Sequence, residues 1–270
     1  MKKIVLIGKN IDHSFSPFVH NFYYDKLNIR ANYQLLNIQS KTKLKKIIEK
    51  MKSSNIDAAN VTSPYKAEII SYLDYIDPVA ESIGSVNCIK VSNGLLKGYN
   101  TDWIGFTKAI KNFQRFNNVV IFGNGGVVPA VIKSIDEQKK VKINIIARNS
   151  IDFKSNNCIH HNIDDFHLDG ENHIIINSLP SNANINWSRL FKSIHGNVLY
   201  GIDLNYHKNV TKFLNSLSNN IEKENGLNML IYQALKSIDL WFDKNLIITE
   251  NITEIKNIII RKFYKDKNYE

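Results

Sequence analysis

The sequence predicts an α/β protein with two domains, each built on a largely parallel sheet. Three observations carry this prediction. The chain has 270 residues, enough for two ordinary domains with their own cores. Short apolar, β-branched segments alternate with longer segments whose apolar residues recur three or four apart, the pattern of strands linked by helices. A hairpin signal followed by a new strand–turn–helix near the middle of the chain then divides it into two parts.

The first half contains three predicted strands, two helices and a hairpin. "PFVHNFYYDKLN" (17–28) and "KTKLKKIIEKMKSS" (41–54) have helical spacing of apolar residues. "SVNCIKVSNGLLKGYN" (85–100) predicts two short strands around Asn93-Gly94, the strongest two-residue hairpin signal. Across the whole chain, the other predicted strands lie at 3–8, 32–38, 57–62, 119–123, 142–148, 173–178 and 198–204.

A domain boundary is predicted at 100–103, directly after the hairpin. "DWIGFTKAIKNF" (102–113) has the pattern of a bridging helix, and the next strand opens the second half. Beyond Gly226 two amphipathic helices are predicted, in 227–242 and 253–265. The pattern alone does not decide which half these helices pack against.

Composition indicates a globular protein of a reducing compartment. The chain is 43% hydrophobic and 22% charged, and no apolar run approaches the length of a membrane span. The apolar run in "MKKIVLIG" is too short for a signal peptide and is predicted to be a buried strand. Two cysteines, Cys88 and Cys158, provide neither a disulfide framework nor a metal cluster. We therefore expect a cytoplasmic protein with no metal and no membrane partner.

The formal net charge of +10 raises the question of a nucleic-acid partner. The lysines are scattered among many Asn and Ile residues, and no clustered basic motif accompanies them. A solvated basic surface is the simpler interpretation, and no nucleic-acid partner is expected.

The glycine turn after strand 119–123 favours a dinucleotide site. Gly123, Asn124, Gly125 and Gly126 lie between a strand and a helical segment, where glycines allow close approach of a pyrophosphate to helix N–H groups. A glycine-rich turn in any α/β domain is the plain alternative. The next strand ends at Arg148, where NAD-binding folds carry an acid; an arginine there suits the 2′-phosphate of NADP.

Two further polar clusters have both a plain and a functional interpretation. In "HSFSP", Ser14 and Ser16 are two positions apart, so an extended segment would aim both hydroxyls at one carboxylate; the alternative is that they cap the helix beginning at Pro17. In "NVTSPYK" (60–66), Lys66 near a predicted helix start at Pro64 is either a surface lysine or a proton donor to a bound substrate.

Taken together, the motifs resemble those of the shikimate dehydrogenase family. They are "DHSFSPFVHN", "NVTSPYK", "SVNCIK", "NGLLKGYNTD", "FGNGG", "DLNY" and "NGLNMLIYQA", in that order between Lys3 and Phe242. The resemblance implies NADPH-dependent reduction of 3-dehydroshikimate to shikimate, a step of aromatic amino-acid biosynthesis. It also implies a substrate domain (1–101), a Rossmann-type NADP-binding domain (102–225) and C-terminal helices (226–270) that return to the substrate domain, with the reaction in a cleft between the domains.

The resemblance also assigns roles to single residues. Lys66 and Asp102 are implied to act together at the ring oxygens, with Lys66 as the proton donor. Ser14 and Ser16 are implied to bind the substrate carboxylate. The remaining implied contacts are Thr62, Asn87, Tyr206 and Gln233 to the substrate, and Gly226 near the nicotinamide. His13 and His20 are interpreted as structural.

The departures from the family pattern fall in the second half. The family's Asn-Arg-Thr is Ala147-Arg148-Asn149 here, and Asp152 stands near the position where a second arginine is usual. The other departures are Pro129, the segment 177–180 and Lys208. An NAD-dependent quinate/shikimate dehydrogenase is therefore an alternative, and a non-catalytic nucleotide- or nucleic-acid-binding module is a more distant one. The sequence leaves a homodimer open.

Overall fold

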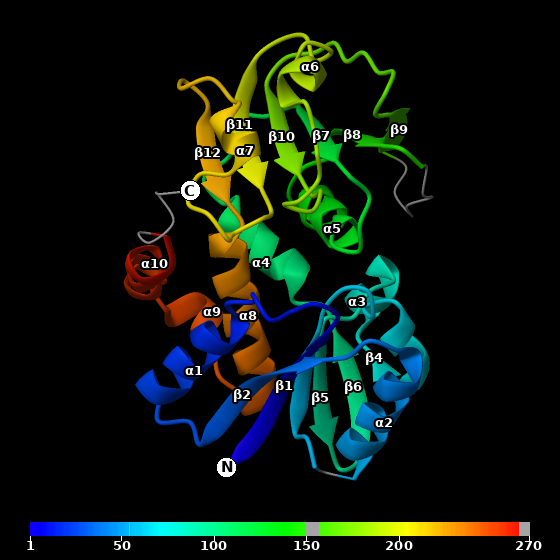
Figure 1. The fold of residues 1–270 in the computed structure, drawn as a ribbon, viewed down its shortest axis with the longest axis vertical. Helices are drawn as coiled ribbons and strands as arrows, with labels where there is room; N and C mark the ends of the chain where they lie inside the picture. Colours follow the sequence, from blue (N-terminus) through cyan, green and yellow to red (C-terminus); the bar gives the residue numbers. More distant parts are fainter. Residues whose placement is uncertain (54, 150–156, 265–270) are drawn as a thin grey trace. The chain divides into compact units, whose positions relative to one another are not determined.

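The computed structural model describes residues 1–53, 55–149 and 157–264 (Figure 1). Contacts between residues divide the chain into two compact units. The first unit comprises residues 1–105 and 231–255, and the second comprises 106–230 with the described residues from 256 onward. Both are α/β structures with six-stranded sheets, as the alternation of strands and helices predicts.

The first unit has a mixed sheet in the order β2-β1-β3-β5-β6-β4. β1 pairs in parallel with β2 and β3, whereas β5 runs antiparallel to both β3 and β6. The strands are β1 (Lys2–Gly8), β2 (Ala31–Asn37), β3 (Ala58–Val61), β4 (Tyr75–Ile76), β5 (Cys88–Ser92) and β6 (Leu95–Tyr99). The helical segments are α1 (Ser16–Lys26), α2 (Lys41–Lys52), η1 (Glu68–Tyr72), α3 (Pro78–Ile83) and α9 (Leu246–Thr249).

Helical spacing explains the core of the first unit. Leu44, Ile47, Ile48 and Met51 of α2 lie three or four residues apart and are all buried against the apolar face of the sheet. α2 begins where the Ser40 hydroxyl accepts a hydrogen bond from the Lys43 N–H (3.4 Å). The predicted hairpin joins β5 to β6, and Asn93 and Gly94 both have the positive φ of a type I′ turn.

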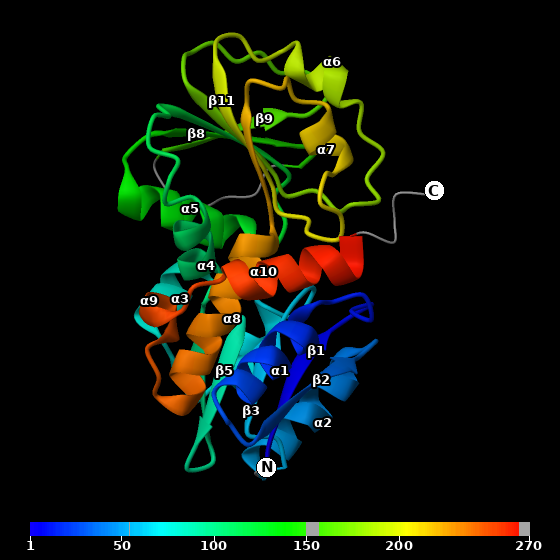
Figure 2. The same cartoon turned by 90° about the vertical axis from the view of Figure 1, so that its left-hand side faces the viewer.

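The second unit has an all-parallel sheet in the order β12-β11-β10-β7-β8-β9. The strands are β7 (Asn118–Phe122), β8 (Lys142–Ala147), β9 (Cys158–Asn162), β10 (His173–Asn177), β11 (Val198–Asp203) and β12 (Glu222–Asn225). The helices within it are α5 (Val128–Gln138), α6 (Trp187–Phe191), α7 (Lys212–Asn215) and η2 (Ile260–Tyr264). Figure 2 shows α5 on one side of this sheet and α6 and α7 on the other.

Both faces of the second sheet are buried, as expected of a parallel sheet covered by helices. Along β7, Val119 and Ile121 belong to one apolar cluster, which includes residues of α5. The alternate residues Val120 and Phe122 belong to the other cluster, with residues of α6 and α7. Side chains alternate between the two faces of a strand, so a continuous apolar run supplies both cores.

Three helices contain the points at which the chain passes between the units. They are α4 (Asp102–Ala109), α8 (Leu227–Phe242) and α10 (Thr253–Ile259). The unit boundaries therefore lie inside helices. The first two follow Gly105 and Leu230, a few residues beyond the domain ends at 101 and 225 that the family resemblance implied. The segment from 226 onward is also divided: 231–255 belongs to the first unit, and the described residues from 256 to the second. None of the described helices is long and apolar enough to cross a membrane.

The structure contradicts one local prediction, the helix start at Pro64. The Ser63–Pro64 peptide bond is cis, and a turn follows in which the Tyr65 N–H donates to the Thr62 carbonyl (3.0 Å). The Lys66 carbonyl accepts a hydrogen bond from the Val86 N–H (2.9 Å), so the backbone at Val86 holds this segment in place. The helical turn η1 begins only at Glu68. The strands β4, β9 and β12 were not predicted, because β4 has only two residues, β9 (CIHHN) has a single β-branched residue, and β12 (EKEN) has no apolar residue.

Candidate active site

The central feature of the first unit is an ion pair between two residues 36 positions apart in the chain. Lys66 Nζ lies 2.7 Å from Asp102 Oδ2, and the two side chains are only 12% and 10% exposed. Lys66 is in the turn after β3, and Asp102 is the first residue of α4. The Asn100 side-chain oxygen accepts the Asp102 N–H (3.0 Å), which fixes the start of that helix. The pair predicted from sequence is therefore formed.

Asn87 holds the other oxygen of the Asp102 carboxylate. Its Nδ2 donates to Asp102 Oδ1 (2.8 Å) and to Thr101 Oγ1 (3.0 Å). Its Oδ1 accepts the Thr101 N–H (2.6 Å). Because each carboxylate oxygen has its own donor, Asp102 can neither rotate nor withdraw without breaking a hydrogen bond.

Two residues of α8 also belong to this hydrogen-bond network. The Thr101 hydroxyl lies 3.5 Å from Gln233 Oε1 and 3.2 Å from the Ser237 hydroxyl. Ser237 in turn accepts from Asn60 Nδ2 (3.0 Å). Gln233 is buried among these groups, with 8% of its surface exposed. The predicted residue Gln233 thus reaches the same cluster as Asp102.

Asn60, Thr101 and Ser237 are members of this network that the motif analysis did not single out. Asn60 has a full set of partners, since its Oδ1 also accepts from the Tyr33 hydroxyl (2.8 Å) and its Nδ2 donates to the Asn87 carbonyl (3.0 Å). Asn60 lies in the motif "NVTSPYK" with Lys66, and Thr101 directly precedes Asp102 in "NGLLKGYNTD". Their places in these motifs were the sequence signal that could have identified them as site residues.

Ser14 and Ser16 are also side by side, with their hydroxyl oxygens 3.2 Å apart. Ser16 is the first residue of α1, and the cap position is Phe15, which makes no side-chain cap hydrogen bond. Capping therefore does not account for Ser16. Ser14 does contact the start of the helix, since its Oγ accepts the Ser16 N–H (3.2 Å), and this bond fixes the two hydroxyls relative to each other.

Strand direction brings these segments to one edge of the sheet. The Ser14 segment follows β1, and Thr62 follows the parallel neighbour β3. β5 is antiparallel to β3 and β6 to β5, so Asn87 before β5 and Asp102 after β6 lie at that same edge. This is the edge where α/β sheets place their binding sites. Thr62 is partly exposed there, and its N–H donates to the Ile7 carbonyl (2.9 Å).

His20 of α1 is fully buried. Its ring stacks on Tyr33 with 3.9 Å between centroids, and its Nδ1 is 2.9 Å from the Ser16 carbonyl. Desolvation lowers the pKa of His20 to about 3, outweighing the hydrogen bond to Ser16 that raises it. A neutral, stacked imidazole supports a structural role.

The second unit contains a cavity of about 650 Å³ at the carboxyl edge of its sheet. The predicted residues Gly123, Asn124 and Arg148 line it, together with Asn149. Gly123 has a φ of +98°, and a Cβ there would lie 2.6 Å from Ser178 Oγ, so this position requires glycine. By contrast, Cβ atoms on Gly125 and Gly126 would meet nothing within 4 Å. Open space in front of the turn that leads into α5 fits a bound pyrophosphate.

A second arginine, which no sequence motif signalled, lines the same cavity. Arg189 is on α6, and its Nη2 donates to the Asp164 carbonyl (3.3 Å). Asp164 also lines the cavity. Asp152, the residue that departs from the family's usual arginine, lies outside the residues that the structure describes. The cavity therefore has two arginines, Arg148 and Arg189, from different elements.

Tyr206 and Gly226 both lie after strands of the second unit. The Tyr206 carbonyl accepts from the Tyr264 hydroxyl. The Gly226 N–H donates to the carbonyl of Asn205 (3.2 Å), the neighbour of Tyr206. Both residues follow the paired ends of β11 and β12, the same edge of the sheet as the glycine turn.

Comparison with known proteins gives a consistent family. A profile of the shikimate dehydrogenase substrate binding domain matches residues 6–89. The chain is 34% identical over 252 residues to "Shikimate dehydrogenase (NADP(+))" of Clostridium beijerinckii, covering 87% of this chain and 90% of that one. It is 35% identical to the enzyme of the same name from Methanococcus maripaludis, covering 90% and 92%.

Solved structures that resemble this chain belong to the same family. A shikimate dehydrogenase crystallised in complex with NADP+ has 32% identity and a TM-score of 0.82, covering 98% of this chain and 96% of that one. Shikimate dehydrogenase 1 of Peptoclostridium difficile has 29% identity and a TM-score of 0.80, covering 97% and 98%.

Proposed function

Because this chain belongs to the shikimate dehydrogenase family, we propose that it catalyses the reversible, NADPH-dependent reduction of 3-dehydroshikimate to shikimate. This places it among the oxidoreductases that act on CH–OH groups, in the shikimate pathway toward chorismate and the aromatic amino acids. The observation that carries the proposal is the largely buried Lys66–Asp102 pair, with Asn87, Thr101 and Gln233 around it.

The proton chemistry is proposed to rest with Lys66. The Lys66 ammonium donates a proton to the carbonyl oxygen of the substrate as the adjacent carbon is reduced, and the neutral amine is then reprotonated from solvent. In the direction of oxidation the amine accepts the hydroxyl proton. NADPH, when bound, supplies the hydride. The hydrogen bond of 2.7 Å to Asp102 keeps the ammonium in one place, so the donor is aligned before the substrate arrives.

We propose that the remaining polar groups recognise the other parts of the substrate. Ser14 and Ser16, with hydroxyls 3.2 Å apart, suit the two oxygens of the substrate carboxylate. Thr62, Asp102 and Gln233 offer donors and acceptors to the ring hydroxyls. Asn87, whose amide N–H groups donate to Asp102 and Thr101, is proposed as a further contact on the basis of the family motif. Tyr206 is proposed as a further substrate contact on the basis of the family motif alone.

NADP is held, in this proposal, by the turn Gly123–Gly126 and by the two cavity arginines. The space left open at Gly125 and Gly126 allows a pyrophosphate to approach the backbone of the turn that leads into α5. Arg148 and Arg189 supply positive charge for the 2′-phosphate. Gly226 is proposed to lie near the nicotinamide. Arg189 would replace the cation that the family usually carries where this chain has Asp152.

The proposal is tested by following NADPH oxidation in the presence of 3-dehydroshikimate with purified enzyme. We expect saturable turnover, and a kcat/KM for NADPH well above that for NADH. In the reverse direction, shikimate should be preferred to quinate. No turnover with either nucleotide would overturn the function, and a strong preference for NADH with activity on quinate would establish the NAD-dependent alternative.

A further inference from the structure

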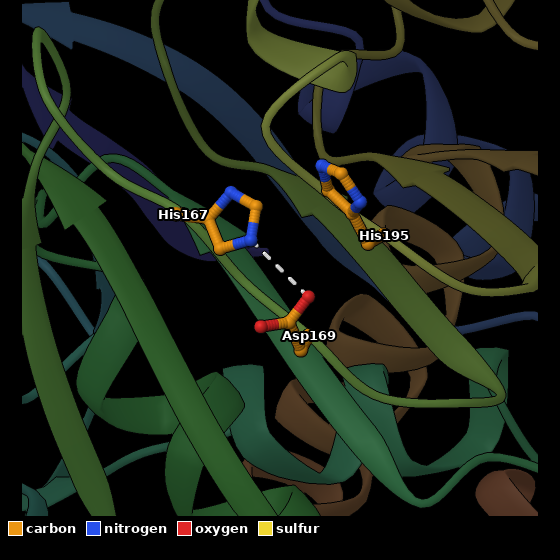
Figure 3. Close-up of side chains that lie close together, drawn as sticks. All are labelled: His167, Asp169 and His195. Atoms are coloured by element: carbon orange, nitrogen blue, oxygen red, sulfur yellow. Dashed lines mark hydrogen bonds and ion pairs between the residues drawn. The ribbon is translucent and has the colours of Figure 1, made fainter.

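Three potential metal ligands lie together on the surface of the second unit. They are His167, Asp169 and His195, drawn in Figure 3. One ligand atom from each residue lies within 4.8 Å of the other two. His167 Nε2 is 3.2 Å from Asp169 Oδ1, and the two imidazole rings are 4.4 Å apart between centroids. All three side chains are exposed.

Strand geometry explains why these three side chains share a face. Leu168 forms an isolated parallel bridge with Ile194, and both residues are buried in the apolar core. Side chains alternate along an extended segment, so the residues on either side of Leu168 and the one after Ile194 point away from that core. His167, Asp169 and His195 therefore emerge together toward solvent.

The backbone beneath the cluster is tightly held. The Leu168 N–H donates to the Ser193 carbonyl (2.8 Å), and the His195 N–H donates to the Leu168 carbonyl (2.7 Å). The His195 carbonyl contacts His173 Nε2 (3.0 Å). A Cβ on Gly196 would lie 1.6 Å from the Gly170 carbonyl oxygen, so only glycine permits this close approach of the two segments. The ligand-bearing backbone is thus preorganised, while the exposed side chains can still rotate.

We propose that His167, Asp169 and His195 bind one Zn²⁺ ion. Two imidazoles and one carboxylate form a common zinc ligand set, and water can complete the coordination on the exposed side. Ligand atoms about 2.0–2.1 Å from a tetrahedral zinc are about 3.3 Å apart. The His167–Asp169 pair already has a spacing of 3.2 Å, so rotation of the exposed His195 side chain completes the site.

The position of the site indicates a structural function. His167 and Asp169 precede β10, and His195 precedes β11, so the cluster lies at the amino end of these parallel strands. The glycine turn and Arg148 follow the carboxyl ends of β7 and β8, the opposite edge of the same sheet. A bound ion would therefore link the β9–β10 connection to the α6–β11 connection without entering the cofactor cavity.

The experiment is isothermal titration of ZnCl₂ into chelator-treated protein that carries no histidine tag. We expect one saturable site in the wild type. His195→Asn and Asp169→Asn should each weaken it about tenfold or more, since each removes one of three ligands. Glu171→Gln, which removes a nearby exposed carboxylate outside the cluster, should leave the affinity unchanged. Circular dichroism checks that each variant is folded.

Thermal unfolding provides a second readout. Zinc should raise the Tm of the wild type and of Glu171→Gln, but not that of His195→Asn, because an ion that binds only the folded state stabilises it. The proposal is overturned if the wild type shows no saturable binding. It is equally overturned if His195→Asn and Asp169→Asn bind zinc as tightly as the wild type, which would place the ion elsewhere.

Discussion

At the scale of single residues, the site depends on Lys66, a lysine whose side chain is largely buried. Lys66 and Asp102 are each about one tenth exposed and are joined at 2.7 Å. Asn87 and Lys66 occupy one carboxylate oxygen each, so the pair has a single arrangement. Such an arrangement suits a proton donor, whereas an exposed ion pair would fluctuate and contribute little.

Replacement of Lys66 by alanine is expected to lower kcat by roughly 10²–10⁴-fold, the range for loss of a general acid–base group. Asp102→Asn, which keeps the shape of the side chain but removes its charge, should also lower kcat. Lys46→Ala, at an exposed lysine of α2 in the same unit, is the matched control and should leave kcat unchanged. Steady-state kinetics with NADPH measure all three. A Lys66→Ala enzyme within a few-fold of wild type would refute the assigned role.

The second prediction at the residue scale concerns Arg189. Its guanidinium lines the cofactor cavity with Arg148. Arg189→Ala removes a charge-assisted contact to the 2′-phosphate and should therefore raise the KM for NADPH roughly tenfold. The KM for NADH, which has no 2′-phosphate, should hardly change.

This comparison of nucleotides separates a phosphate contact from a structural role of Arg189, because damage to the cavity would affect both cofactors equally. Arg115→Ala, an exposed arginine of the same unit that does not line the cavity, serves as the control. Equal effects of Arg189→Ala on NADPH and NADH would count against the phosphate contact.

At the scale of elements, α1, β2 and α8 meet around a buried histidine. His20 of α1 stacks on Tyr33 of β2 and lies 5.6 Å from the ring of Trp241 of α8. The Trp241 ring N–H donates to the Ile89 carbonyl of β5 (3.0 Å). These aromatic contacts attach the two helices to the sheet, and the Tyr33 hydroxyl donates to Asn60 (2.8 Å), which in turn donates to Ser237. The support of the site is therefore sensitive to any charge placed on His20.

The pKa of His20 leads to a pH prediction. Burial lowers it from the ordinary 6.5 to about 3 in the folded protein. Between these values the unfolded chain binds a proton that the folded chain does not, so the free energy of unfolding decreases as pH falls below 6.5. The contribution of His20 is at most about 1.4 kcal/mol per pH unit. His20→Phe keeps an aromatic ring against Tyr33 but cannot be protonated.

Urea unfolding between pH 7.5 and pH 4.5, with both ends checked for reversibility, measures this effect. We expect a shallower loss of stability on acidification in His20→Phe than in the wild type, whatever the difference between them at pH 7.5. Identical pH slopes would show that His20 is not the buried neutral group described here.

At the scale of the whole molecule, the chain forms two compact units that carry different parts of the proposed chemistry. Lys66, Asp102, Ser14, Ser16 and Gln233 all belong to the first unit. The glycine turn, Arg148 and Arg189 belong to the second. Each set is positioned by hydrogen bonds and packing within its own unit, so each ligand should be bound mainly by one unit.

Hydrogen exchange with single ligands tests this division. Shikimate alone should slow exchange in the segments around Ser14–Ser16, Asn87 and Thr101–Asp102. NADP+ alone should slow exchange around Gly123–Val128 and Arg189. At a ligand concentration of 100 Kd the stabilisation is about 2.7 kcal/mol, which is readily measured as slower exchange. Protection by shikimate confined to the segments predicted for NADP+ would contradict the assignment.

Local signals in the sequence were enough for much of the fold and of the candidate site. The seven isolated strands, the Asn93–Gly94 hairpin and helix 227–242 depend on periodicity and turn chemistry within a few residues. The glycine turn and the order of the motifs likewise indicated which residues belong to the family pattern. The helix predicted at Pro64 was wrong because distant partners, through the Val86 N–H and the Lys66 carbonyl, hold that segment in another conformation.

Apart from the Lys66–Asp102 pair, which the family resemblance implied, only the tertiary structure decided which distant residues meet. The antiparallel half of the first sheet brings Asn87 to Asp102, and α6 places Arg189 beside the cavity of Arg148. The parallel bridge at Leu168 gathers His167, Asp169 and His195. The physical reason is range: periodicity, turn chemistry and glycine geometry act between residues close in the chain. Ion pairs, cavities and ligand clusters arise from strand pairing across tens of residues, and no local pattern encodes that pairing.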